Sequence, residues 1–204
     1  ITAPRTITTT GDAVSFATNV TLNGGTGGLV SIDTTSGSAA GANVTFSGTL
    51  NATTAGANAE KLTLNAGTGG NVLFTGAVGG GTRLGDVTIT NANDVTESAG
   101  LIARSLTQSA GQGTTLLTGA VNTDTGTGVA LTTSAITANN TITTTNAGTV
   151  TFSNAGLLTL NGNITSDGAV TQNGAGAVTI TAPRTITTTG DAVSFATNVT
   201  LNGG

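Results

Sequence analysis

Apolar and small polar residues alternate along most of the chain. The recurring cassette has two apolar residues around a Thr or Ser, as in Val14-Ser15-Phe16. Because successive side chains of a β-strand point to opposite faces, this alternation predicts short strands with one buried face. Turn-forming runs such as Asn23-Gly24-Gly25 separate the cassettes. No stretch has the apolar stripe and caps of a helix, so we expect almost no helix.

The cassettes follow one another without a terminating feature. Val14, Val30 and Val44 begin three of them, and the spacing shortens after about residue 130. A β-sandwich also has short strands, but its core tends to use aromatic and bulkier residues. The pattern therefore predicts an all-β fold, a single-stranded parallel β-helix (β-solenoid). We expect roughly 20–30 residues per coil, as in other repeat architectures.

A long stretch of sequence occurs twice. Residues 180–204 repeat residues 1–25 without a change, at an offset of 179 residues. Such identity indicates a tandem array, in which each unit buries its apolar face against its neighbours. We predict that residues 1–179 are one full repeat of a continuous β-solenoid of about six to nine coils. Residues 180–204 are then the start of the next identical repeat, with no linker.

All five Phe residues occupy the third place of the cassette. The alternation puts each Phe on the same face as the Val two residues earlier. We therefore expect them in an inward apolar ladder, and not in a stripe that stacks on sugars. The predicted core ladder comprises Val14, Phe16, Val44, Phe46, Val72, Phe74, Val87, Ile89, Val150, Phe152, Val193 and Phe195.

Charge and several chemically active residue types are scarce. Only 7% of residues are charged, the net charge is −4, and His, Cys, Trp and Tyr are absent. Without clustered Lys and Arg or aromatic platforms, no nucleic-acid partner is expected. No run is long and apolar enough to predict a direct membrane span. The missing His and Cys exclude catalytic triads of the Ser-His-Asp type and make a zinc site implausible.

Carboxylates are the remaining candidates for chemistry. A carbohydrate-active β-helix would use two of them, but the chain has no Trp or Tyr to hold a sugar ring. Residues 122–128 are rich in oxygen ligands, yet they lack the string of carboxylates that a calcium loop supplies, so a solvated turn is expected. We predict no catalytic residue, no cofactor and no metal, and thus no enzyme. The acids considered are Asp12, Asp33, Glu60, Asp86, Asp94, Glu97, Asp124, Asp167 and Asp191.

Threonine pairs leave one further alternative open. Thr88-Ile89-Thr90 and Thr141-Ile142-Thr143 would each present two hydroxyls on one side of a strand. A Thr-rich β-solenoid that binds ice or a mineral needs the same pair on successive coils, and the pairs in this sequence are irregular. Threonine is also simply a favourable strand residue.

Three stretches resemble a known class of repeat. Residues 43–50, 71–90 and 158–180 are similar to the strand repeats of giant bacterial surface proteins, of the filamentous-haemagglutinin and autotransporter types. The resemblance covers most of the chain and rests on the motifs V-T-F/I/L followed by G-x-V or L-N-G. It implies a right-handed parallel β-helical shaft without catalytic residues.

The same resemblance implies a function. Proteins of this class use such shafts as long stalks or fibres that hold an adhesive tip away from the cell. We therefore expect a stiff structural segment of an extracellular bacterial fibre or adhesin stalk, secreted to the cell surface. Its expected partners are adjacent repeats or protomers of the same protein, joined head to tail. Any contact with a host surface or matrix is expected elsewhere in the full protein.

Overall fold

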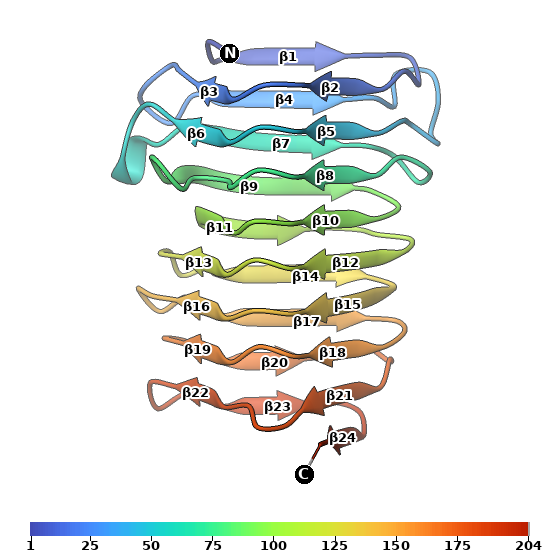
Figure 1. Ribbon diagram of the computed structural model, residues 1–204, viewed down its shortest axis with the longest axis vertical. Coiled ribbons are helices and arrows are strands. Elements are labelled where there is room, and N and C mark those ends of the chain that lie inside the picture. The colour runs from blue at the N-terminus through green and yellow to red at the C-terminus, as the bar shows by residue number, and fades with distance from the viewer. Residues whose placement is uncertain (204) are drawn as a thin grey trace.

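The computed structural model describes residues 1–203 as an all-β parallel solenoid of about nine turns. Each coil passes three strand positions, which we name faces A, B and C. Figure 1 shows the coils stacked from the N-terminal end to the C-terminal end, with the strands of faces A and B running in opposite directions. The fold predicted from the alternation is confirmed.

Face A begins at the N-terminal end and runs the whole length of the solenoid. Its strands pair in parallel, each with the one a coil further along. They are β1 (Arg5–Thr8), β4 (Leu29–Asp33), β7 (Lys61–Asn65), β9 (Leu84–Asn91), the second half of β11 (Leu101–Gln108), β14 (Val129–Thr133), β17 (Val150–Asn154), β20 (Val170–Gln172) and β23 (Val193–Phe195).

Face B is a nine-stranded parallel sheet, again with one strand from each coil. Its strands are β2 (Val14–Phe16), β5 (Val44–Phe46), β8 (Val72–Phe74), β10 (Val95–Glu97), β12 (Thr114–Leu117), β15 (Ala135–Ala138), β18 (Leu158–Leu160), β21 (Val178–Thr181) and β24 (Val199–Asn202).

Face C has the shortest strands. They are β3 (Val20–Leu22), β6 (Leu50–Ala52), the first half of β11, β13 (Val121–Thr123), β16 (Ile142–Thr144), β19 (Ile164–Ser166) and β22 (Ile186–Thr188). In the third coil the single residue Val78 occupies the strand position of face C. It forms parallel β-bridges with Leu50 in the preceding coil and with Leu101 in the following coil. Face C therefore continues without a gap from β3 to β22.

Coil length explains why the cassette spacing shortens along the sequence. On face B, Val14 pairs with Val44 and Val44 with Val72, which are offsets of 30 and 28 residues. Further along, Leu158 pairs with Val178, an offset of only 20. The first coils are longer because they contain the corner loops at residues 34–43 and 53–60. The second loop contains η1 (Gly56–Asn58), the single helical turn among residues 1–203.

Apolar side chains fill the interior, as period-two alternation requires. Eight residues of the predicted ladder are at most 1% exposed: Val44, Phe46, Val72, Phe74, Val87, Ile89, Val150 and Phe152. Val14, Phe16 and Phe195 are partly buried, and Val193 is 42% exposed in the last described coil.

The Phe residues lie on two faces instead of in one ladder. Phe16, Phe46 and Phe74 stack on face B, with ring centroids 4.9 and 5.4 Å apart. Phe152 and Phe195 lie on face A, where Gln172 separates them in the same inward column. The cassette fixes which side of a strand is buried, but it does not fix the face on which the strand lies.

Strand β21 crosses the boundary between the two copies of the repeated sequence. Thr179 ends the first unit and Ile180 begins the second, and both lie within this strand. The strand pairs with β18 on one side and β24 on the other. The boundary is thus a position inside a continuous stack.

Candidate functional site

Glu60 joins two successive corner loops of the solenoid. Its buried carboxylate accepts hydrogen bonds from the backbone N–H groups of Gly24 and Gly25 at 3.0 and 2.9 Å. The N–H groups of Thr53 and Thr54, both at 3.0 Å, and the two threonine hydroxyls complete the set. Glu60 directly precedes β7, so this clamp fastens the end of the first repeated segment to the corner loop at 53–60 in the next coil.

Hydrogen bonding keeps the Glu60 carboxylate ionised. Burial raises the pKa of Glu60, but the donors from Gly25, Thr53 and Thr54 outweigh burial and hold the pKa well below its usual range. A buried carboxylate with this many donors is a structural anchor, because it has no free lone pair to offer a substrate. It is therefore unsuited to general acid or base chemistry.

Glu97 forms a second corner clamp. It occupies the third, inward place of the cassette on β10 and is 1% exposed. Its carboxylate accepts the backbone N–H groups of Ala99 at 2.8 Å, Gly119 at 3.0 Å and Gly100. Glu97 thus continues the inward column of Phe74 with a charged group, and it satisfies turn donors in two successive coils.

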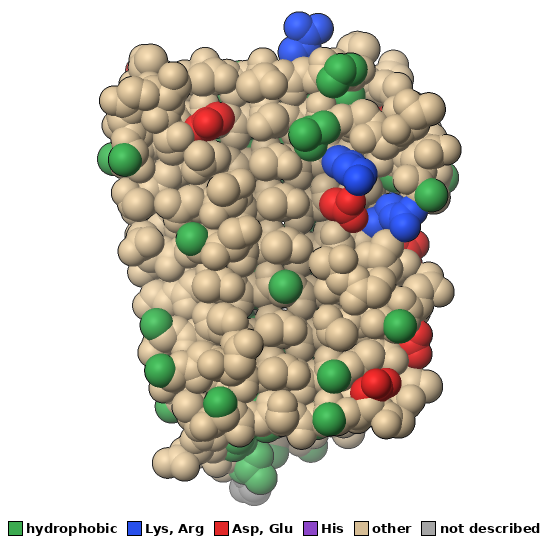
Figure 2. All heavy atoms as spheres, turned by 180° about the vertical axis from the view of Figure 1, so that it is seen from behind, with side chains coloured by type: hydrophobic (Ala, Val, Ile, Leu, Met, Phe, Trp, Pro, Cys, Tyr) green, Lys and Arg blue, Asp and Glu red, His purple; other side chains and the backbone are tan. Residues whose placement is uncertain are grey.

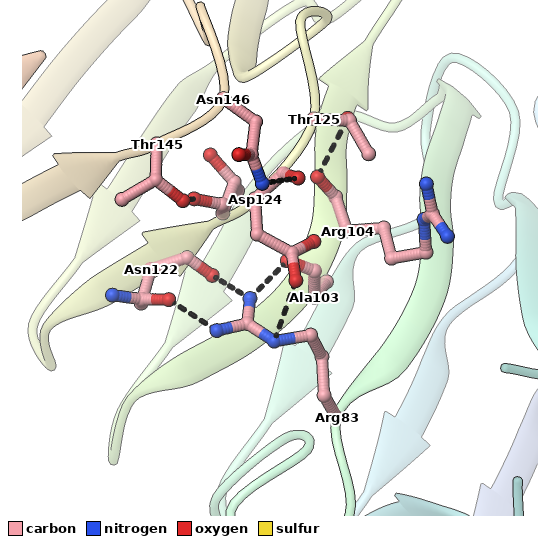
Figure 3. Close-up of polar contacts among 9 residues, drawn as sticks. Arg83, Ala103, Arg104, Asn122, Asp124, Thr125, Thr145 and Asn146 are labelled. Carbon is pink, nitrogen blue, oxygen red and sulfur yellow. Dashed lines mark hydrogen bonds and ion pairs between the residues drawn. The ribbon is translucent and has the colours of Figure 1, made fainter. Parts of the chain in front are cut away.

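Arg83 organises the loop that the sequence marked as oxygen-rich (Figure 3). Its guanidinium donates to the carbonyl oxygens of Ala103 at 2.6 Å and Asn122 at 3.1 Å, and to the Asn122 side chain. It also pairs with Asp124 at 3.4 Å. In residues 122–128 the single carboxylate is therefore neutralised by an arginine, which is a poor arrangement for a cation.

Asp86, Asp94 and Asp167 also join neighbouring coils. Asp86 pairs with Lys61 at 2.9 Å, where both side chains are partly exposed, so the pair contributes little to stability. Burial raises the pKa of Asp86. The hydrogen bond and positive charge of Lys61 outweigh burial, so the pKa of Asp86 lies below its usual value. Asp94 and Asp167 each accept a backbone N–H from a neighbouring coil, at 2.7 Å.

Two observations concern possible metal and sugar sites. Among residues 1–203 no group of three or more His, Cys, Asp or Glu side chains is placed to hold a metal ion. A shallow groove of about 410 Å³ crosses face B, lined by amide, hydroxyl and leucine side chains with Asp94. None of its lining residues is aromatic, so it lacks the flat platform on which a sugar ring stacks.

Threonines form single columns on the outer surface. On face B, Thr137, Thr159, Thr179 and Thr200 lie in register on four successive coils. The outward positions two residues earlier are Ala135, Leu157, Ala177 and Asn198. On face B the threonine column therefore has no second column beside it, and it does not form the paired array of hydroxyls that the ice-binding alternative requires.

Uncharged polar groups dominate the outer surface. Figure 2 shows the side of the molecule opposite to Figure 1, where charged groups are few and hydrophobic side chains are scattered singly. Scattered apolar side chains are ordinary on a soluble surface and do not define a docking patch. Three of the five large hydrophobic residues exposed among residues 1–203 lie in the last described coil, namely Val193, Val199 and Leu201.

The two copies of the repeated segment differ in the exposed fraction of their apolar side chains. Leu22 is 0% exposed beneath β6, whereas the identical residue Leu201 is 74% exposed in the last described coil. Val20 is 8% exposed and its copy Val199 is 37% exposed. The first copy is covered by a following coil and the second is not, and this change accompanies the change in exposure. The last described coil thus presents an open strand edge with the same residues that β5 and β6 cover in the first copy.

Comparisons with protein-family models, curated proteins and solved structures found no match for this chain. Within residues 1–203 there is also no helix with the length and hydropathy needed to cross a membrane. Sequence reasoning assigned no role to Glu60, Glu97 or Arg83. Glu97 carried a signal, because it holds the cassette place that Phe holds elsewhere, whereas the partners of Glu60 lie too far away in the sequence to be recognised.

Proposed function

We propose that this chain is a structural segment of a long extracellular bacterial fibre or adhesin stalk. It acts as a stiff rod, in which stacked β-coils transmit load through backbone hydrogen bonds and inward apolar ladders. The role is mechanical and involves no catalysis. Adjacent repeats are its partners, joined end to end in one stack.

One observation carries the proposal. The repeated segment is covered by the next coil in its first copy and uncovered in its second, as the exposures of Leu22 and Leu201 illustrate. A further unit added after the second copy would supply the same covering strands, β4 to β6, and bury the same residues. A copy of the segment inside a longer array would therefore be buried as the first copy is.

Three further features support an extracellular setting. The chain has no cysteine, so its stability does not depend on the redox state of its surroundings. Its stability comes from many similar neighbouring contacts, which suits a long exposed shaft. The resemblance of residues 71–90 and 158–180 to bacterial surface repeats agrees with this setting.

Immunogold electron microscopy on cells that produce the protein tests the proposal. Antibodies raised against the chain should decorate unbranched filaments outside the cell, with gold along the shaft. Pre-immune serum provides the control. Label confined to the cytoplasm, or label on particles without filaments, would contradict the proposed role.

A further inference from the structure

Identical sequence lies on different faces at the two ends of the solenoid. The strand Val-Ser-Phe is β2 on face B in the first copy and β23 on face A in the second. The strand Val-Thr-Leu moves from face C (β3) to face B (β24). The pair Ile-Thr at residues 7–8 moves from face A (β1) to face C, where its copy at residues 186–187 lies in β22. All three strands have shifted by one face in the same direction.

Pairing partners establish the shift residue by residue. Ser15 pairs with Thr45 on face B. Its copy, Ser194, pairs with Thr171 on face A. On face B the last pairing is Thr179 with Thr200, and Thr200 is the copy of Thr21 from face C. Ile186, the copy of Ile7 from face A, pairs with Ile164 on face C. The shift is therefore found in the pairing of three separate strands.

The cause is the length of the unit. From β1 to β22 the chain advances by seven complete coils and two further faces, which makes 23 strand positions. The two halves of β11 count separately, because they pair with β13 on face C and with β14 on face A. Since 23 is not a multiple of three, the unit cannot return to the face on which it began.

The two arrangements of the segment are compatible with each other. In the first copy β2 pairs along one edge with the later strand β5. In the second copy β23 pairs along its other edge with the earlier strand β20. The first copy thus reveals the segment's neighbours in the next coil, and the second copy reveals its neighbours in the preceding coil. A copy inside an array can satisfy both sets of neighbours at once.

We propose that successive units of a tandem array are rotated by one face, a third of a turn, about the axis of the rod. This inference rests on the proposed function in one respect, that further units continue the same stack. The array then has a three-unit period, and each outward group of the unit recurs on three sides of the rod. A partner that binds one unit meets equivalent surfaces on all sides and not along a single stripe.

Engineered cysteine pairs test the face assignment in the chain itself. The chain has no cysteine, so each double variant has one defined thiol pair. In-register neighbours on adjacent strands are roughly 4.8 Å apart, within the usual Cα range of disulfides. The pair Thr171→Cys with Ser194→Cys should oxidise almost completely. The pair Thr179→Cys with Ser194→Cys should keep its free thiols, because those residues lie on different faces.

Free-thiol titration and peptide mass spectrometry give the readout, and circular dichroism checks each reduced variant for native folding. Ser15→Cys with Thr45→Cys is the matched control, because it places the identical serine on face B. Oxidation of the Thr179 pair in place of the Thr171 pair would show that both copies use the same face and overturn the proposal. Failure of both pairs, with the control oxidised, would overturn it too. Neither result depends on whether the protein forms filaments outside cells.

Discussion

At the residue scale, two buried carboxylates satisfy backbone donors at the corners of the coils. Glu60 and Glu97 are at most 1% exposed, yet each accepts several backbone N–H groups from two or more coils. Turns leave backbone donors without strand partners, and an unpaired buried donor costs about 1–3 kcal/mol. A single carboxylate thus satisfies a whole corner. Losing one such clamp should affect stability more than losing a surface ion pair.

Replacing Glu60 with Gln should destabilise the chain by about 3 kcal/mol near neutral pH, because charge-assisted hydrogen bonds are lost and an amide N–H₂ faces backbone donors. The pKa of Glu60 is lowered in the folded state, so its contribution is fully present above the unfolded value of 4.5. It declines as the pH falls below that value, since the unfolded chain then binds a proton that the folded chain does not. The stability gap between wild type and E60Q should therefore narrow in acid.

Urea denaturation at about pH 6 and about pH 3 measures this gap. Asp12→Asn is the control, because Asp12 is exposed in a turn and its replacement removes the same charge. The D12N variant should stay within about 0.5 kcal/mol of wild type at neutral pH. A gap between wild type and E60Q that is equal at both pH values would contradict the clamp.

The phenylalanine ladder makes a second residue-scale prediction. Phe74 is 1% exposed and stacks on Phe46, so Phe74→Ala should cost about 3–5 kcal/mol. Phe195 is only partly buried in the last described coil, and Phe195→Ala should cost clearly less. Chemical denaturation of the two variants checks the order. Equal losses would argue against a cavity cost that depends on the covering coil.

Glycines at the coil corners make a third prediction. A Cβ on Gly162 would lie 1.9 Å from the carbonyl oxygen of Asn140 in the preceding coil, although its backbone needs no positive φ. Gly162→Ala should therefore cost about 1–3 kcal/mol through overpacking. Gly80 is exposed, and its Cβ would meet only Ala77 at 3.4 Å, so Gly80→Ala is the matched control. Equal thermal midpoints for the two variants would contradict this account of coil spacing.

At the element scale, the sequence predicts strands better than it predicts their positions in a coil. Val14-Ser15-Phe16 shows its buried side through alternation alone, which is a local property. Its face depends on how many residues the preceding turns consume, as the offsets of 30 and 20 residues in different coils demonstrate. The identical cassette at Val193 lies on another face for this reason.

The hydrogen-bond partners of the buried polar side chains are a second feature that the sequence does not predict. Glu60 reaches Gly24, which is 36 residues earlier, and no local pattern joins two residues across a coil. Gln172 is similar, because its buried amide donates to Asn154 and to turn carbonyls where the apolar ladder would otherwise continue. Such residues are understood only once the coils are stacked.

At the scale of the whole molecule, successive coils pair through the same parallel strands and form a rod with an open strand edge at each end. Each coil contacts mainly the coils before and after it, so stability accumulates along the axis. The last described coil presents Val193, Val199 and Leu201, at 42, 37 and 74% exposure. An added unit would cover them as strands β4 to β6 cover their copies in the first coil. A tandem chain should therefore be more stable per unit than the present one.

The most direct test of the rod is its length as units are added. Chains with one, two and three tandem units should be imaged by cryo-electron microscopy or measured by small-angle scattering. Each added unit contributes seven coils and two faces, so at roughly 4.8 Å per coil the rod should lengthen by about 37 Å at constant width. Separate compact particles joined by flexible connections, with no constant increment in length, would contradict a continuous solenoid.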